Sequence, residues 1–142
     1  MGPEAATVPL QVGPVGRLIH EPDGAVIRAG MMEAVAPGKD RWLLAESVAY
    51  LSSDEPLDSP VVHSFEVLQV LEWDIAGARR WLRERRVGTV EIKVRAIDID
   101  PAALRRELRP KGPGELTLIL AKTLQGARMI ACRRVARTSS GL

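Results

Sequence analysis

The stretch Thr89-Val90-Glu91-Ile92-Lys93-Val94-Arg95-Ala96-Ile97 decides the fold. Apolar and polar side chains alternate along it without interruption, which is the period of a strand with one buried and one exposed face. The residues predicted to point inward are Val90, Ile92, Val94 and Ala96, and those predicted to point outward are Glu91, Lys93 and Arg95. We therefore expect a half-exposed strand here, with other elements covering its apolar face.

One helix is predicted before this strand in the sequence and a second helix after it. Asp74 is a suitable N-cap for a helix over residues 75–86, and Gly88 is suited to the left-handed conformation that often ends a helix. Asp100-Pro101 places an N-cap before a proline in the first helical position, which predicts a second, shorter helix up to residue 108.

The remaining apolar segments after residue 60 are typical of strands. We predict strands over residues 61–73, 116–123 and 127–135, and the last two form a hairpin across residues 124–126. The order from residue 61 on is then β-α-β-α-β-β. This is an α+β arrangement of the ferredoxin-like kind, with the helices on one face of a sheet.

The first part of the chain has a weaker pattern. Residues 1–16 hold three Pro and three Gly, which is typical of a leader or linker. Residues 17–20 suggest a short strand, the sequence from Glu21 opens a largely buried helix that runs to residue 35, and residues 42–51 suggest a second strand. The polar loop 52–60 marks a boundary. We therefore predict a leader (1–16), a β-α-β subdomain (17–60), a second domain (61–135) and a tail (136–142).

Charge is distributed unevenly along the chain. Residues 1–72 hold four basic and eleven acidic residues, a net charge of −7, whereas residues 73–142 hold sixteen basic and seven acidic residues, a net charge of +9. One interpretation is that the basic half faces a polyanion. The other is that the acidic and basic halves pack against each other, and charge alone favours neither.

Several kinds of site are unexpected in this sequence. The single cysteine, Cys132, excludes an internal disulfide and a multi-Cys zinc site, and His20 and His63 have no metal-ligand spacing around them. Neither Gly13-Pro14-Val15-Gly16 nor Lys111-Gly112-Pro113-Gly114 has the context of a nucleotide-binding loop. We expect no catalytic, cofactor-binding or metal-binding residues in this chain. The absence of a signal peptide and of a long apolar run predicts a soluble, cytoplasmic protein without a membrane partner.

Arginine patterning is the strongest functional signal. Arg79, Arg83 and Arg86 fall at helical spacing on one face of the first predicted helix, and further basic residues follow on the next strand, helix and loop. Arginine suits bidentate contact with phosphate, although a charged helix face is often only solvated. The candidate nucleic-acid-binding residues are Arg79, Arg83, Arg86, Lys93, Arg95, Arg105, Arg109 and Lys111. Phe65 and Tyr50 lie in strand patterns, and Trp73 and Trp81 are predicted in the core. This scarcity of exposed aromatics favours recognition of a nucleic-acid backbone over base stacking.

The residues from Gly88 to Pro101, followed by Leu104-Arg105-Arg106 and Leu108, resemble the THUMP-like domain that ends a group of bacterial class I S-adenosylmethionine-dependent methyltransferases. The earlier run from Leu18 to Gly30, with its Glu-Pro-Asp, is similar to the segment that follows the catalytic domain in that group. This sequence departs from the family's strand motif Ile-Lys-Lys-Arg-Gly, because Val94 replaces the second Lys and Ala96 replaces the Gly. The resemblance covers residues 12–135.

This resemblance implies an accessory domain of an S-adenosylmethionine-dependent RNA methyltransferase. A catalytic domain, in the same chain or in a partner, would bind S-adenosylmethionine, and this chain would position a structured RNA such as tRNA or rRNA. The acidic first part would dock on the catalytic domain. The alternatives are a stand-alone protein-interaction module with a solvated basic face, and a small enzyme that uses His20 with Glu21 or Asp23.

Overall fold

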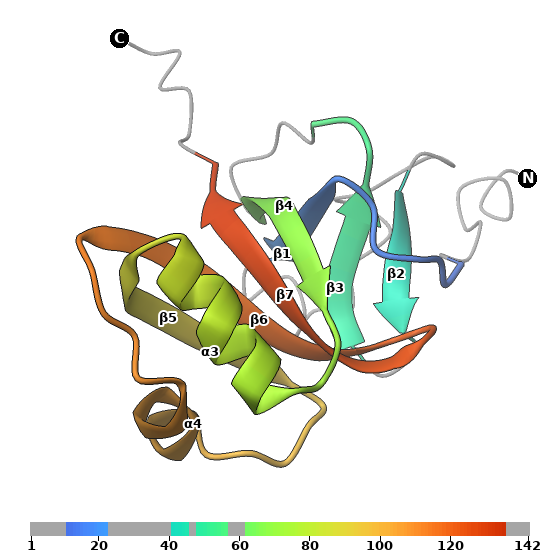
Figure 1. The fold of residues 1–142 in the computed structure, drawn as a ribbon. Helices are drawn as coiled ribbons and strands as arrows, with labels where there is room; N and C mark the ends of the chain where they lie inside the picture. The colour runs from blue at the N-terminus through green and yellow to red at the C-terminus, as the bar shows by residue number, and fades with distance from the viewer. Residues whose placement is uncertain (1–10, 23–40, 46–47, 57–61, 136–142) are drawn as a thin grey trace, which may run out of the picture.

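The structure is a computed structural model that describes residues 11–22, 41–45, 48–56 and 62–135. Within these residues the chain forms seven strands and two helices. In chain order these elements are β1 (Leu18–Pro22), β2 (Arg41–Ala45), β3 (Val48–Ser53), β4 (Val62–Leu71), α3 (Ile75–Glu84), β5 (Val87–Arg95), α4 (Pro101–Leu108), β6 (Gly114–Thr123) and β7 (Gly126–Arg134). The α+β class and the order β-α-β-α-β-β after residue 60 are confirmed (Figure 1).

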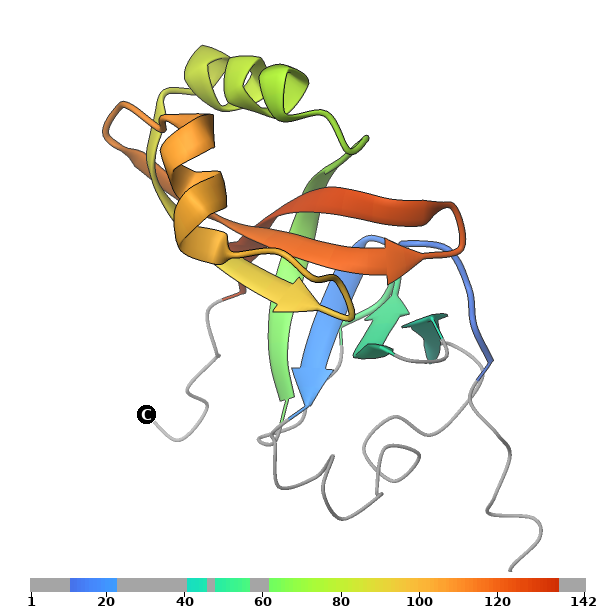
Figure 2. The same ribbon diagram turned by 90° about the horizontal axis from the view of Figure 1, so that it is seen from below.

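All seven strands belong to one mixed sheet with the order β2-β3-β1-β4-β7-β6-β5. Only β5 and β6 are parallel, and the other neighbours are antiparallel. Strand β1 pairs along its whole length with β4, so the sheet continues without a break across the predicted boundary at residue 60. Figure 2 shows α3 and α4 on one side of the β6–β7 ribbon and β1, β2 and β3 on the other side.

Two cores form because alternate residues of β6 point to opposite faces. Leu118 and Leu120 join the helix-side core, where they pack with Leu82 of α3 and Leu104 of α4. Ile119 and Ala121 join the sheet-side core, which also contains Ile19, Leu44, Tyr50, Phe65, Ile130 and Cys132. The sheet-side core therefore joins strands from both predicted domains.

The boundaries of several predicted elements differ from the structure. The single strand predicted over residues 42–51 is wrong, because β2 and β3 form an antiparallel pair there. Ser52 and Ser53, predicted in a loop, are fully buried residues of β3. Strand β1 continues through Glu21 and Pro22, so no helix begins at Glu21. The rest of that predicted helix, residues 23–35, lies outside the described residues, as do residues 1–10 and the tail.

Gly88 is not the left-handed residue behind α3, contrary to the prediction. Arg86 takes that conformation, with φ of 56°. Gly88 lies in β5, where an added Cβ would come within 1.9 Å of the carbonyl oxygen of Gly112. Glycine is required here because two backbone segments approach each other closely.

Residues 17 and 135 both bond to β4 through the backbone. The amide of Val67 donates to the carbonyl of Arg17 at 2.9 Å, and the amide of Val135 donates to the carbonyl of Ser64 at 3.0 Å. Before Arg17, Gly16 donates its amide to Ser52 Oγ, and Val12 forms a parallel bridge with Leu43 at the edge of β2. Residues 11–16 of the predicted leader are thus held by β2 and β3.

Candidate nucleic-acid interface

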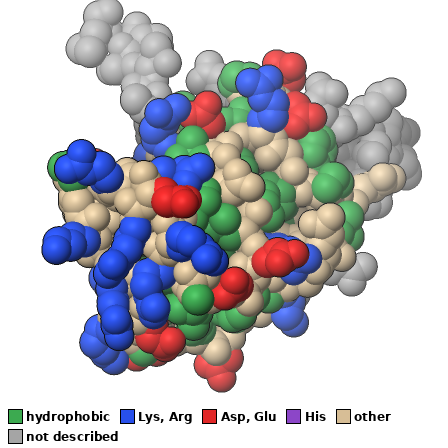
Figure 3. Space-filling model, in the orientation of Figure 1, with side chains coloured by type: hydrophobic (Ala, Val, Ile, Leu, Met, Phe, Trp, Pro, Cys, Tyr) green, Lys and Arg blue, Asp and Glu red, His purple; other side chains and the backbone are tan. Residues whose placement is uncertain are grey.

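Basic side chains gather over the two helices. Figure 3 shows Lys and Arg concentrated on the side of the molecule that α3 and α4 occupy. Arg85 and Arg105 on this side bond to other described residues. The exposed members whose side chains form no such bond, which we call the basic cluster, are Arg80, Arg83, Arg86, Arg106, Arg109 and Lys111. Four of them, Arg83, Arg86, Arg109 and Lys111, belong to the predicted set.

Two turns bring the C-terminal ends of α3 and α4 together. The amide of Lys111 donates to the carbonyl of Val87 at 3.0 Å, and the amide of Gly114 donates to the carbonyl of Arg86 at 2.9 Å. The contact between Gly88 and Gly112 allows this approach. As a result, Arg86 from one turn and Lys111 from the other lie at a shared corner of the molecule.

Arg86 and Arg109 also have a local role at the helix ends. Arg109 is the left-handed C-cap of α4, with φ of 48°, and Arg86 follows the C-cap of α3 with φ of 56°. Basic side chains complement the partial negative charge at a helix C-terminus. This accounts for part of the charge at the corner but not for Arg80, which lies in the middle of α3.

Two of the predicted residues, Arg79 and Arg105, use their guanidinium groups in hydrogen bonds to backbone carbonyls of the fold. Arg79 donates two hydrogen bonds to the carbonyl of Glu107, which ties α3 to α4. Arg105 donates from Nε to the carbonyl of Val90 at 3.2 Å, which ties α4 to β5. In contrast, the six residues of the basic cluster form no ion pair with any other described residue.

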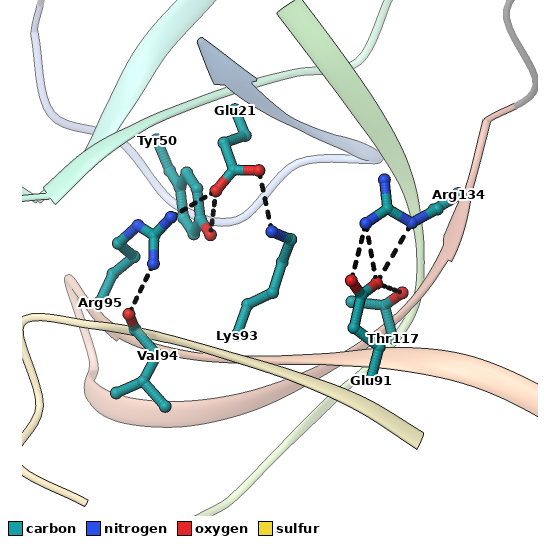
Figure 4. Close-up of polar contacts among 8 residues, drawn as sticks. All are labelled: Glu21, Tyr50, Glu91, Lys93, Val94, Arg95, Thr117 and Arg134. Atoms are coloured by element: carbon teal, nitrogen blue, oxygen red, sulfur yellow. Dashed lines mark hydrogen bonds and ion pairs between the residues drawn. The ribbon is translucent and has the colours of Figure 1, made fainter. Parts of the chain in front are cut away.

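Lys93 and Arg95 lie on the opposite face of β5 from the helices. Both bond to Glu21 of β1, with Lys93 Nζ 3.0 Å from Oε1 and Arg95 Nη2 2.6 Å from Oε2 (Figure 4). Tyr50 donates its hydroxyl to the same carboxylate at 3.0 Å. The structure therefore separates these two residues from the other six members of the predicted set.

Glu21 is charged because of these contacts. Burial raises its pKa, but hydrogen bonds from Lys93 and Tyr50 and the charges of Lys93 and Arg95 outweigh burial and lower the pKa below its usual value. Sequence reasoning missed this cluster, since Glu21 lies more than 70 residues from Lys93 and carries no local signal of a partner on β5.

A second paired cluster lies further along the same face. Arg134 of β7 and Thr117 of β6 donate to the carboxylate of Glu91, and the hydrogen bonds from Arg134 lower the pKa of Glu91 (Figure 4). The guanidinium of Arg134 lies 5.1 Å from the centre of the Phe65 ring. Lys93, Arg95 and Arg134 on this face are therefore paired with carboxylates, in contrast with the basic cluster on the helices.

His20 is a fully buried residue that bridges three strands. Ser53 donates its hydroxyl to the carbonyl of Glu55, so it accepts a hydrogen bond from His20 Nε2 at 2.7 Å. Because Nε2 carries the proton, Nδ1 of His20 accepts a hydrogen bond from the Ser64 hydroxyl, 2.8 Å away. Burial, with a smaller contribution from the charge of Arg41, lowers the pKa of His20 to about 4. This histidine is neutral near pH 7 and connects β1, β3 and β4.

Cys132, the other candidate reactive group, lies among apolar side chains. Cys132 is buried in the sheet-side core, and burial raises its pKa to about 12. In the part of the chain that the structure describes, no group of three or more His, Cys, Asp or Glu side chains could hold a metal ion. No helix of that part is long and apolar enough to cross a membrane.

The prediction that Trp73 lies in the core is wrong, whereas Trp81 packs against the helix-side core. Trp73 has 37% of its surface exposed at the end of β4. Trp81 is only partly buried and lines a shallow groove between β4 and α3, with the guanidinium of Arg85 4.0 Å from its ring centre.

Known proteins resemble this chain over most of its length. The family model described as THUMP domain-like matches residues 62–134. Two Mycobacterium tuberculosis proteins, from strains CDC 1551 / Oshkosh and ATCC 25618 / H37Rv, are described as uncharacterized S-adenosylmethionine-dependent methyltransferases. Each is 38% identical over 128 residues, which are 90% of this chain and 35% of the relative. The chain thus spans about a third of the length of these curated relatives.

A solved structure shows the same fold. The crystal structure of a "putative methyltransferase" from Porphyromonas gingivalis W83 superimposes with a TM-score of 0.71 at 18% identity. The superposition covers 94% of this chain and 33% of that chain. The described fold, including β1, β2 and β3, is therefore found within a larger protein.

Proposed function

Residues 62–134 show that this chain belongs to the THUMP domain-like family, and on this premise we propose that it is the RNA-binding accessory part of an S-adenosylmethionine-dependent methyltransferase. It positions a structured RNA, such as tRNA or rRNA, for a catalytic domain in the same chain or in a partner. That catalytic domain binds S-adenosylmethionine and carries the chemistry, in the cytoplasm.

The observation that supports this proposal most strongly is the difference in pairing between the two faces. Lys93, Arg95 and Arg134 neutralise carboxylates on the sheet side, whereas the six residues of the basic cluster have no acidic partner among the described residues. Unpaired arginines on a common surface are suited to bind phosphate groups, with release of counterions from the nucleic acid.

The geometry favours contact with the nucleic-acid backbone. Arg83 and Arg86 lie at the end of α3, next to Lys111 in the loop that bonds to the same turn. Three cations at one corner can contact neighbouring phosphates. Such contacts position a nucleic acid without reading its sequence.

Binding of a fluorescently labelled tRNA tests this role. The double variant Arg83→Glu/Arg86→Glu should bind at least about 10-fold more weakly than wild type at moderate salt, and its salt slope should fall by about 2. Lys122→Glu/Arg128→Glu makes the same charge change at the far end of β6, and we expect it to bind close to wild type.

Equal losses in the two double variants would assign the binding to net charge and count against a specific surface. Absence of binding to tRNA and rRNA fragments at low salt would overturn the RNA role. A protein-interaction module would then be the better description of the chain.

A further inference from the structure

A shallow groove lies beside the basic cluster, between the second half of β4 and α3. Its volume is about 370 Å³. This lies within the range of about 300 to 1,000 Å³ that is typical of small-molecule sites. Arg80 of the basic cluster lines the groove, so an RNA strand bound to the cluster passes next to it.

The wall of the groove on α3 is aromatic. Trp81 lines the groove, and its indole Nε1 is buried without a hydrogen-bond acceptor among the described residues. Arg85 lies 4.0 Å from the centre of the indole ring. An aromatic ring beside arginines is the combination on which proteins stack unpaired nucleic-acid bases.

Three carboxylates supply hydrogen-bond acceptors to the groove. Glu72, Asp74 and Glu84 line it, together with the guanidinium of Arg80 and the amide of Gln69. Carboxylates repel phosphate, but they accept hydrogen bonds from the exocyclic amino groups of adenine and cytosine. A base can therefore enter the groove while its phosphates stay on the neighbouring arginines.

Gly77 leaves room for one of these carboxylates. Glycine is among the least favourable residues inside a helix, so stability does not explain its presence in α3. A Cβ at residue 77 would lie 2.6 Å from Oδ2 of Asp74, and would displace that carboxylate from its position in the groove. The absence of a side chain at Gly77 keeps the acceptor where a base could reach it.

From these contacts we infer that the groove is a subsite for one unpaired, amino-bearing nucleobase (adenine, cytosine or guanine) in preference to uracil. The base stacks on Trp81, and the carboxylates accept its amino group. This inference rests on the proposed RNA role and adds to it a preference that the basic cluster alone would not have.

Three RNA hairpins with the same stem test the inference: one fully paired, one with a single bulged adenine and one with a single bulged uridine. The full chain should bind the bulged-adenine hairpin more tightly than the fully paired one, because the base stacks, and about 10-fold more tightly than the bulged-uridine hairpin, because uracil has no amino group for the carboxylates to accept. Gly77→Ala should remove this preference and leave the affinity for the paired hairpin unchanged. Ala76→Ser, on the same helix outside the groove lining, should behave as wild type.

The outcomes separate the two proposals. Equal binding of all three hairpins, or an unchanged adenine preference in Gly77→Ala, would overturn the groove inference and leave the RNA role in place. Binding of none of the hairpins would overturn both. Because alanine favours a helix, loss of preference in Gly77→Ala cannot be assigned to unfolding.

Discussion

The buried histidine makes stability dependent on pH. The pKa of His20 is about 4 in the folded protein and 6.5 in the unfolded chain, so the unfolded chain binds more protons between these values. Stability should therefore fall as the pH is lowered from about 6.5 to 4, by at most about 3 kcal/mol. Urea unfolding at a series of pH values measures this loss.

His20→Gln provides the control for this titration. Glutamine can bond to both serines but does not titrate, so its stability should change less over the same pH range. Equal pH dependence in the variant and wild type would show that carboxylates cause the loss instead.

Glu21 is expected to matter more for stability than an exposed acid in a similar pair. Its side chain is 13% exposed and bonds to Lys93, Arg95 and Tyr50, whereas Glu66, paired with Arg133, is 44% exposed. Glu21→Gln should lower the free energy of unfolding by about 2 to 4 kcal/mol, because two partly buried cations lose their counter-charge. Glu66→Gln should cost less than about 1 kcal/mol. Denaturant melts of the two variants compare them directly.

At the level of elements, the edge strand β5 accepts hydrogen bonds from groups outside its pairing with β6. Three carbonyls of β5 accept such bonds, from the Lys111 amide, the Arg105 side chain and the Arg95 side chain. Terminal strands often need such protection against pairing with other chains. Arg105→Ala should cost about 1 kcal/mol of stability and increase self-association, whereas Arg106→Ala should do neither. Denaturant melts and sedimentation at increasing protein concentration measure both effects.

The contact between the two turns gives a stronger element-scale prediction. Gly88→Ala would place a Cβ 1.9 Å from the Gly112 oxygen, so the contact between β5 and the loop of residues 109–113 has to open. We expect a loss of about 3 kcal/mol and weaker RNA binding. Gly126→Ala is the control, because its Cβ would meet only the end of the Arg128 side chain. That change should cost about 1 kcal/mol, for the positive φ alone.

Element prediction from sequence succeeded where periodicity and capping agreed. Asp100 accepts the Ala102 amide as the predicted N-cap, and β4, α3, β5, α4, β6 and β7 all lie close to their predicted residues. The break between β2 and β3 was missed because residues 41–53 hold no Gly, Pro, Asn or Asp to signal a turn. Pairing of β3 with β1 decides that region, and such a long-range contact leaves no local pattern.

For the whole molecule, the two interpretations of the charge asymmetry apply to different faces. Glu21 from the acidic part neutralises Lys93 and Arg95, as expected if the halves pack together. The arginines on the helices have no such partner among the described residues. The sequence could therefore predict the basic residues but not their division, since pairing depends on how the sheet brings β1 close to β5.

The shared sheet-side core predicts that both parts of the chain unfold together. A fragment of residues 62–135 would expose Phe65, Ile119 and Ile130, which pack against Ile19, Leu44 and Tyr50 in the whole chain. We expect the full chain to show one cooperative transition and the fragment to lack dispersed NMR signals. A well-dispersed spectrum of the fragment would instead support two independent domains.

Strand β4 is flanked by residues 17 and 135, since Arg17 bonds to Val67 on one side and Val135 bonds to Ser64 on the other. Neighbouring strands lie about 4.8 Å apart and successive residues about 3.3 Å, which puts residues 17 and 135 roughly 15 Å from each other. A short linker could join them, and new termini could be opened at Leu124, an exposed residue of the β6–β7 turn. A chain that runs from residue 17 to residue 135 is thus suited to circular permutation, with the start of β1 and the end of β7 joined beside β4.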